Sequence, residues 1–305
     1  MLELSVVICA HNPRKDHLQR VLRALRNQTL PKDCWELLLV DNASHVALAP
    51  VWELSWHPNA HHILETELGL AFARRLGIQH AVTDVLVFVD DDNVLDEDYL
   101  SEVMIIKRDW PFLGVWGSGV TLPEFEMAPP SHLEGLLMHL TLRKTAIISW
   151  SNVPSCIDSH PWGAGMCVRK SVATEYSKLY RQASIYITGH QGKSVVSGGG
   201  EDREICIIAC KTGFGMGVFP QLRLTHLIPK ERVGEKYLLE LAEANLLSDM
   251  LLDYKWRKNM PDTRLTLRRL LSAMTQRRLV RQLYFGSLRA TRRAKTIIEE
   301  SQKTR

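Results

Sequence analysis

Three consecutive aspartates follow an apolar run in the sequence VLVFVDDDN, residues 85–93. The five apolar residues 85–89 show no polar alternation, which predicts a strand covered on both faces within a parallel sheet. Because side chains alternate along an extended chain, Asp90 and Asp92 are expected on one side and Asp91 on the other. Two carboxylates about 6 Å apart repel each other by roughly 3 kcal/mol at an effective dielectric near 20. A divalent cation reverses that sign, so the pattern predicts a metal site.

An acidic cluster after a strand can also be a solvated turn that begins the next helix. Asp96, Glu97 and Asp98 suit that role, because carboxylates favour helix N-termini. For the aspartates that directly follow the apolar strand, the metal site is favoured, since parallel sheets bind ligands at the carboxyl ends of their strands.

Buried runs and helical spacing alternate along the first half of the chain. Strands are predicted at 4–10, 36–40, 62–65 and 85–89, and helices at 14–28 and 69–82. This alternation predicts an α/β fold with a doubly wound, mostly parallel sheet and a Rossmann-like, nucleotide-binding half. The strand ends would bring three polar clusters to one edge of the sheet: His11 and Asn12, Asp41 and Asn42, and Asp90 to Asp92.

The second half of the chain is less regular. Strands are predicted at 113–120 and 162–168, helices at 133–148 and 171–181, and a loop at 123–130. Residues 198–205 read GGGEDREI, in which three glycines precede Glu201 and Asp202 at the start of a helix. A carboxylate in such a place suits general-base catalysis, and the glycines suit the hinge of a closing loop.

Size and composition indicate a globular protein with one large domain, or one domain and an appendage. The chain has 305 residues, 45% of them hydrophobic and 24% charged. It has no apolar run of about 18 residues and no pattern typical of a signal peptide. The six cysteines are scattered without CxxC pairs. A cytoplasmic, reduced chain is therefore expected.

The basic charge is concentrated at the C-terminus. Residues 251–305 contain 15 Lys or Arg against 4 Asp or Glu, whereas the whole chain has a net charge of only +4. We therefore expect a domain at 1–250 and a basic helical appendage at 251–305. Leucines at helical spacing leave two interpretations open: a helix lying on an anionic membrane, or helices packed on the domain. Nucleic-acid binding is not expected, because interleaved aromatic residues are lacking.

Seven segments in order resemble the family 2 inverting glycosyltransferases, which have the GT-A fold. They are SVVICAHN (5–12), LLLVDNAS (37–44), GLAFARRLGI (69–78), VFVDDDN (87–93), WGAGMCVRKSV (162–172), GGGEDREI (198–205) and LRLTHLIPKERV (222–233). Each segment alone is a weak signal, whereas the ordered set is specific and covers roughly residues 4–250.

The resemblance implies transfer of a sugar from a nucleoside-diphosphate donor, with a UDP-sugar favoured, to a saccharide or lipid-linked acceptor. It also implies a divalent metal, Mn²⁺ or Mg²⁺. The residues expected at the nucleotide-sugar are His11, Asn12, Asp41, Arg74, Asp90, Asp91, Lys230 and Arg232; those expected at the metal are Asp90, Asp92 and His226. Asp202 is the expected catalytic base, with Glu201 as the alternative. The protein would then work in the cytoplasm, and at the inner face of the membrane if residues 251–305 bind lipid.

Two further classes of protein fit the sequence less well. A catalytically silent GT-A-like binding module would not need both the aspartate cluster and the Glu201-Asp202 pair, so their presence favours an enzyme. A sugar-1-phosphate nucleotidyltransferase would carry a basic, glycine-rich loop after the first strand, where this chain has ICAHNP (8–13).

Overall fold

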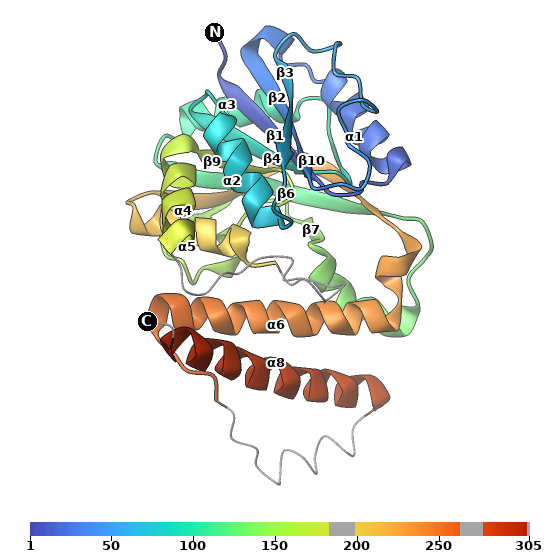
Figure 1. The fold of residues 1–305 in the computed structure, drawn as a ribbon, viewed down its shortest axis with the longest axis vertical. Coiled ribbons are helices and arrows are strands. Elements are labelled where there is room, and N and C mark those ends of the chain that lie inside the picture. Colours follow the sequence, from blue (N-terminus) through green and yellow to red (C-terminus); the bar gives the residue numbers. More distant parts are fainter. Residues whose placement is uncertain (183–198, 263–276, 304–305) are drawn as a thin grey trace. The chain divides into compact units, whose positions relative to one another are not determined.

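The computed structural model describes residues 1–182, 199–262 and 277–303. The chain divides into two compact units: residues 1–126, 141–181 and 201–228 form the first, and residues 127–140, 182–200 and 229–305 the second. The first unit carries the sheet, and the second carries a pair of long helices (Figure 1).

The described part of the first unit contains a ten-stranded sheet. Eight strands follow the order β3-β2-β1-β4-β9-β6-β10-β5, while β7 pairs with β6 and β8 with β10. The strands are β1 (Leu4–Ala10), β2 (Trp35–Asn42), β3 (Ala60–Glu65), β4 (Val85–Asp90), β5 (Asn93–Leu95), β6 (Leu113–Phe125), β7 (Arg143–Lys144), β8 (Ser149–Ser151), β9 (Met166–Arg169) and β10 (Gly215–Ile228). Strands β1 to β4 are mutually parallel, as are β6 and β10, with β9 antiparallel between β4 and β6. The predicted α/β fold class is confirmed.

Helices cover both faces of this sheet. They are α1 (Lys15–Arg26), α2 (Leu70–His80), α3 (Tyr99–Asp109), α4 (Lys170–Gln182) and α5 (Glu201–Lys211). Helix α1 buries Leu18, Leu22 and Leu25, spaced as one helical face, in the same apolar cluster as Ile8 of β1. Helix α2 lies on the opposite face, where Gly77 allows close approach to Val7 of β1.

The structure differs from the sequence-based prediction between β6 and β9. The predicted helix at 133–148 is a 3₁₀ helix, η2 (Ser131–Leu140), followed by β7 and β8. Thr141 has φ 56°, a left-handed conformation that ends the helical run. The predicted loop at 123–130 begins later, because β6 continues beside β10 to Phe125. The predicted strand at 162–168 forms only from Met166 onward.

The second unit contains the helices α6 (Glu235–Arg257) and α8 (Arg278–Lys303), preceded by the 3₁₀ turn η4 (Lys230–Val233). The predicted boundary at residue 250 falls inside α6. Residues 267–274, part of the predicted apolar stripe of the appendage, lie outside the described residues. Among the helices described, none is long and apolar enough to cross a bilayer.

Candidate active site

The strand register brings the three polar clusters to one edge of the sheet, as the strand order requires. Ala10 of β1 pairs with Asp41 of β2, and Cys9 of β1 pairs with Asp90 of β4. The three strands are parallel, so their carboxyl ends lie at the same edge of the sheet. His11, Asp41 and Asp90 lie at these carboxyl ends. This edge is the place where open α/β sheets bind their ligands.

Asp41 and its neighbours hold the loop that follows β2. The buried carboxylate of Asp41 accepts hydrogen bonds from the backbone N–H of Ser44 at 3.0 Å and of Leu48 at 2.9 Å. Asn12 Oδ1 accepts one from the N–H of His45 at 2.8 Å, and His11 Nδ1 lies 2.7 Å from the carbonyl oxygen of Asn42. These polar side chains shape the loop, and contact with a nucleoside remains a prediction for His11, Asn12 and Asp41.

Arg74 of α2 is the buried centre of a charge cluster. Its guanidinium lies 3.5 Å from Asp90 and 3.0 Å from Glu201, and only 5% of the residue is exposed. Burial disfavours the charged guanidinium, but Glu201 and Asp90 outweigh this and keep the pKa of Arg74 above its ordinary value. The neighbouring Cys9 is half-buried, and desolvation of its thiol raises its pKa, so it remains protonated. Arg74 therefore ties the end of β4 to the start of α5.

Asp90 and Asp92 lie in different backbone elements. Strand β4 ends at Asp90, and Asp91 and Asp92 form a turn, so the strand alternation expected for these residues stops. Asp91 is partly exposed in that turn. Asp92 Oδ2 lies 3.5 Å from His226 Nε2 of β10, and both residues are buried. Asp92 also accepts a hydrogen bond from Asn93 Nδ2 at 3.0 Å.

Asp92 and His226 fit one side of a divalent metal site. A carboxylate oxygen and an imidazole nitrogen suit Mn²⁺, whereas Mg²⁺ favours oxygen ligands throughout. Within the described ranges, no group of three or more His, Cys, Asp or Glu residues is arranged to hold a metal. Asp90 lies 3.5 Å from Arg74, and its part in the predicted set of Asp90, Asp92 and His226 remains a prediction. Two protein ligands leave the remaining positions for diphosphate oxygens and water.

Glu201 and Asp202 have different environments at the start of α5. Glu201 is buried against Arg74, with 4% of the residue exposed. Asp202 is partly exposed, and its Oδ2 accepts the backbone N–H of Gly163 at 3.3 Å. A general base must reach a substrate proton, so Asp202 suits that role better than Glu201.

The sequence singled out WGAGMCVRKSV (162–172) but did not predict that residues 160–165 link these groups. A Cβ atom at Gly163 would lie 2.9 Å from Arg74 Nη2, so the missing side chain leaves room for the guanidinium. Arg143 contacts the same segment from outside it. Its guanidinium stacks 4.1 Å from the Trp162 ring and donates a hydrogen bond to the carbonyl oxygen of His160 at 2.8 Å. The two glycines of WGAG were the available signal, since glycine marks close approach of the backbone.

Gly165 gives a direct stability test of this segment. It has φ +69°, and an added Cβ would meet the Tyr99 hydroxyl, which donates to Gly165 O at 2.7 Å. Burial keeps the pKa of Tyr99 well above its ordinary value, so this donor stays protonated. We expect Gly165→Ala to lower the free energy of unfolding by about 1–3 kcal/mol in urea denaturation. Gly135→Ala, where nothing lies within 4 Å, is the control. Equal stability of the two variants would contradict the role given to Gly165.

Lys230 and Arg232 belong to η4 in the second unit. Contact of these cations with a diphosphate remains a prediction.

Comparison with known proteins finds a family match over part of the chain and solved structures of similar fold. Residues 5–119 match the family "Glycosyl transferase family 2". A mannosyltransferase from Pyrobaculum calidifontis, solved with GDP-Man and Mn²⁺, superposes with a TM-score of 0.56 at 15% identity, covering 99% of this chain and 74% of that one. TarS 1–349 of S. aureus superposes with a TM-score of 0.53 at 12% identity, covering 98% of this chain and 92% of that one. TarS has also been solved with UDP and with UDP-GlcNAc.

One curated relative matches a shorter stretch. Polypeptide N-acetylgalactosaminyltransferase 8 of Drosophila melanogaster is 32% identical over 105 residues, which cover 33% of this chain. The match spans only 18% of the length of that relative. The fold is GT-A, and the resemblance to family 2 glycosyltransferases is confirmed by the family match over 5–119.

Proposed function

We propose that this chain transfers a sugar from a nucleoside-diphosphate donor to an acceptor hydroxyl, with inversion at the anomeric carbon. The observation that carries the proposal is one continuous set of contacts in the first unit. Asp90 meets Arg74, Arg74 packs against Gly163 and Glu201, and Gly163 donates to Asp202. These contacts hold both Asp90, a carboxylate at the ligand-binding edge, and Asp202, the candidate base.

The reaction requires a base on the acceptor side and charge stabilisation on the donor side. The acceptor oxygen forms a bond to the anomeric carbon as the bond from that carbon to the diphosphate oxygen breaks. Asp202 takes the hydroxyl proton, and the diphosphate leaves with the bonding electrons. The charge of buried Arg74 is matched by Glu201 and Asp90, so we assign it the role of orienting Asp90.

The donor side is served by Asp92 and His226. A divalent cation held there, with Mn²⁺ favoured by the mixed ligands, would supply Lewis-acid stabilisation of the departing diphosphate. The similar structures contain UDP, UDP-GlcNAc and GDP-Man, so both uridine and guanosine donors belong in the first screen. His11, Asn12 and Asp41 are the candidates at the nucleoside.

The acceptor is proposed to be a saccharide or a lipid-linked saccharide, in saccharide-chain or glycolipid assembly. We propose that the activity takes place in the cytoplasm. For a lipid-linked acceptor, it would take place at the inner face of the membrane. The support is the basic composition of residues 251–305 and the scattered cysteines.

Asp92→Asn tests the donor side. We expect this substitution to abolish the Mn²⁺-dependent part of nucleoside-diphosphate binding, because it removes a ligand charge from the Asp92–His226 pair. Calorimetric titration of UDP and GDP with Mn²⁺ or with a chelator measures the effect. Asp109→Asn, at an exposed ion pair with Arg108, is the matched control. Equal affinity of Asp92→Asn and wild type in both conditions would remove the metal from this place.

A further inference from the structure

Within the part of the chain that the structure describes, helix α8 packs against α6 with one face and leaves the other exposed. Its buried residues Ala294 and Ile298 lie in an apolar cluster with Leu251 and Leu252 of α6. This packing is internal to the second unit and explains the apolar residues on that side of α8. Any partner of α8 must therefore use the other side.

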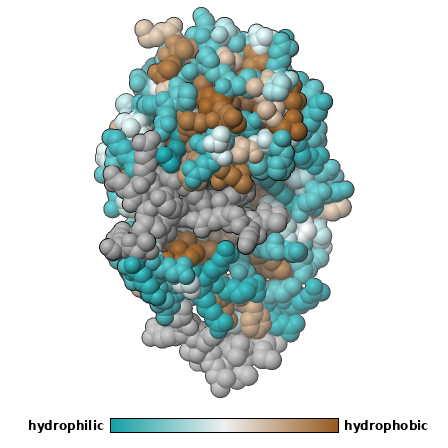
Figure 2. All heavy atoms as spheres, viewed as in Figure 1, coloured by the Kyte–Doolittle hydropathy of each residue, from teal (hydrophilic) through white to brown (hydrophobic). Residues whose placement is uncertain are grey.

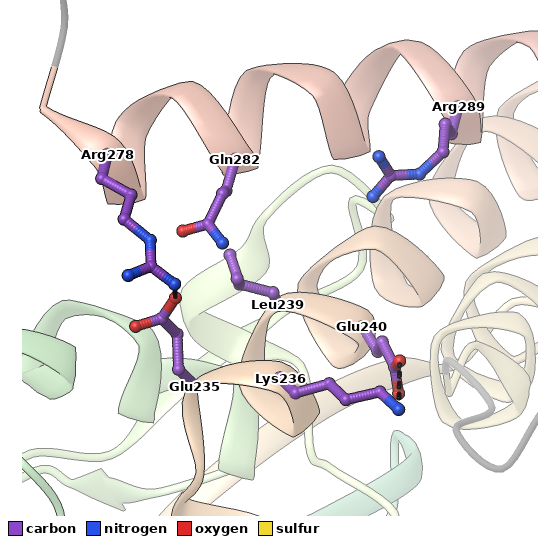
Figure 3. Close-up of a pocket in the computed structure, with 7 residues that line it drawn as sticks. All are labelled: Glu235, Lys236, Leu239, Glu240, Arg278, Gln282 and Arg289. Atoms are coloured by element: carbon purple, nitrogen blue, oxygen red, sulfur yellow. Dashed lines mark hydrogen bonds and ion pairs between the residues drawn. The ribbon is translucent and has the colours of Figure 1, made fainter.

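The arginines nearest to α6 are matched by carboxylates. Arg278 lies 3.3 Å from Glu235, and Arg289 lies 2.6 Å from Glu243. Arg278 and Arg289 also line a groove of about 460 Å³ between the helices, into which Gln282 points (Figure 3). These arginines serve the helix pair itself.

The outward face of α8 is basic, with apolar residues between the cations. Arg281, Phe285 and Arg292 are spaced by four and seven residues, which places them on one face, and all three are exposed. Leu288 lies between them and is partly exposed. Residues 278–298 contain six basic residues and no acidic one. In Figure 2, hydrophilic side chains predominate over the helix pair, with isolated hydrophobic residues among them.

We propose that this outward face, defined by Arg281, Phe285, Leu288 and Arg292, docks on the surface of a bilayer that contains anionic phospholipid. Arginines pair with lipid phosphates, while Phe285 and Leu288 enter the headgroup region between them. A single exposed aromatic residue suffices for such a wedge. Binding of single-stranded nucleic acid draws on several aromatic residues that stack successive bases, and this face offers one.

Docking on a bilayer would bring the enzyme to a lipid-linked acceptor, and only this purpose rests on the proposed function. Docking itself needs neither donor nor metal. It can therefore be measured separately from sugar transfer, and either result can fail without the other.

The experiment is vesicle flotation of the full chain at low salt. Vesicles of phosphatidylcholine alone are compared with vesicles containing 30% phosphatidylglycerol as a suggested composition. We expect binding only to the anionic vesicles, and loss of binding as added salt screens the charges. Each arginine near an anionic surface contributes about fivefold to partitioning, so Arg281→Gln with Arg292→Gln should lower it roughly 30-fold.

The control carries the same change of net charge at another place. Arg23→Gln with Arg26→Gln removes two exposed arginines from α1 and should change partitioning less than about fivefold. Phe285→Ala should weaken binding while leaving its salt dependence in place. Thermal unfolding verifies that each variant folds, which is expected because the substituted arginines are exposed.

Three outcomes would overturn the proposal. The first is absence of binding to anionic vesicles at low salt. The second is equal loss in the α8 and α1 double variants, which would show a general charge effect. The third is binding of an oligonucleotide that depends on Arg281 and Arg292 without any binding to vesicles. A chain that floats but transfers no sugar would instead count against the proposed function.

Discussion

Replacing Asp202 by asparagine is expected to lower sugar transfer by about 10²- to 10⁴-fold while leaving donor affinity within a few-fold. The amide keeps the size of the side chain but cannot take the acceptor proton. Asp202 is partly exposed and lies at the N-terminus of α5, where its Oδ2 accepts the N–H of Gly163. Steady-state kinetics with separate measurement of donor binding gives both quantities.

Glu201→Gln separates the two members of the pair. Glu201 is buried against Arg74, so this change should mainly lower the free energy of unfolding and have less effect on the rate of the chemical step. Full transfer by Asp202→Asn together with loss in a folded Glu201→Gln variant would exchange their roles. Full transfer by both variants would remove the pair from the mechanism.

Arg74→Met is expected to lower the free energy of unfolding by about 3–5 kcal/mol, because it leaves the buried carboxylate of Glu201 without its cation. Chemical denaturation at neutral pH measures this loss. Arg75→Met on the same helix is the matched control, since Arg75 is less buried and its guanidinium lies 6.0 Å from the Phe72 ring. Its loss should be clearly smaller.

The double variant Arg74→Met with Glu201→Leu tests the reason for the effect. Removing both charges takes away the uncompensated ion, so much of the lost stability should return. If the double variant is as unstable as the sum of the single variants, the cost comes from packing, and the Arg74–Glu201 pair is not the stabilising contact.

Much of the first half of the fold was predictable from the sequence because β1, β2 and β4 are buried on both faces, whereas β3 is largely exposed. The runs at 6–10 and 85–89 are apolar without interruption, and the structure places strands there. Residues 133–148 misled the prediction, since their leucines have helical spacing but no sequence signal marks the left-handed backbone of Thr141. Pairing with a distant strand, β10, likewise decided the end of β6.

The candidate site was predictable in its residue types more than in its contacts. The strand ends at Asp41 and Asp90 follow from the parallel order. The turn at Asp91 and Asp92 could not be predicted from the strand order, because side chains alternate only while the strand continues. This turn brings Asp92 to His226. The partner of Arg74, Glu201, lies 127 residues away along the chain, so only the fold could reveal it.

We propose that this edge of the sheet binds and cleaves a nucleoside-diphosphate sugar. Release of nucleoside diphosphate from a panel of UDP- and GDP-sugars, with Mn²⁺ and simple saccharide acceptors, tests it most directly. We expect release from at least one donor that requires Mn²⁺, is lost in Asp92→Asn and Asp202→Asn, and persists in Asp109→Asn. Mn²⁺-dependent nucleotide binding without release from any donor would contradict the claim and indicate the catalytically silent binding module.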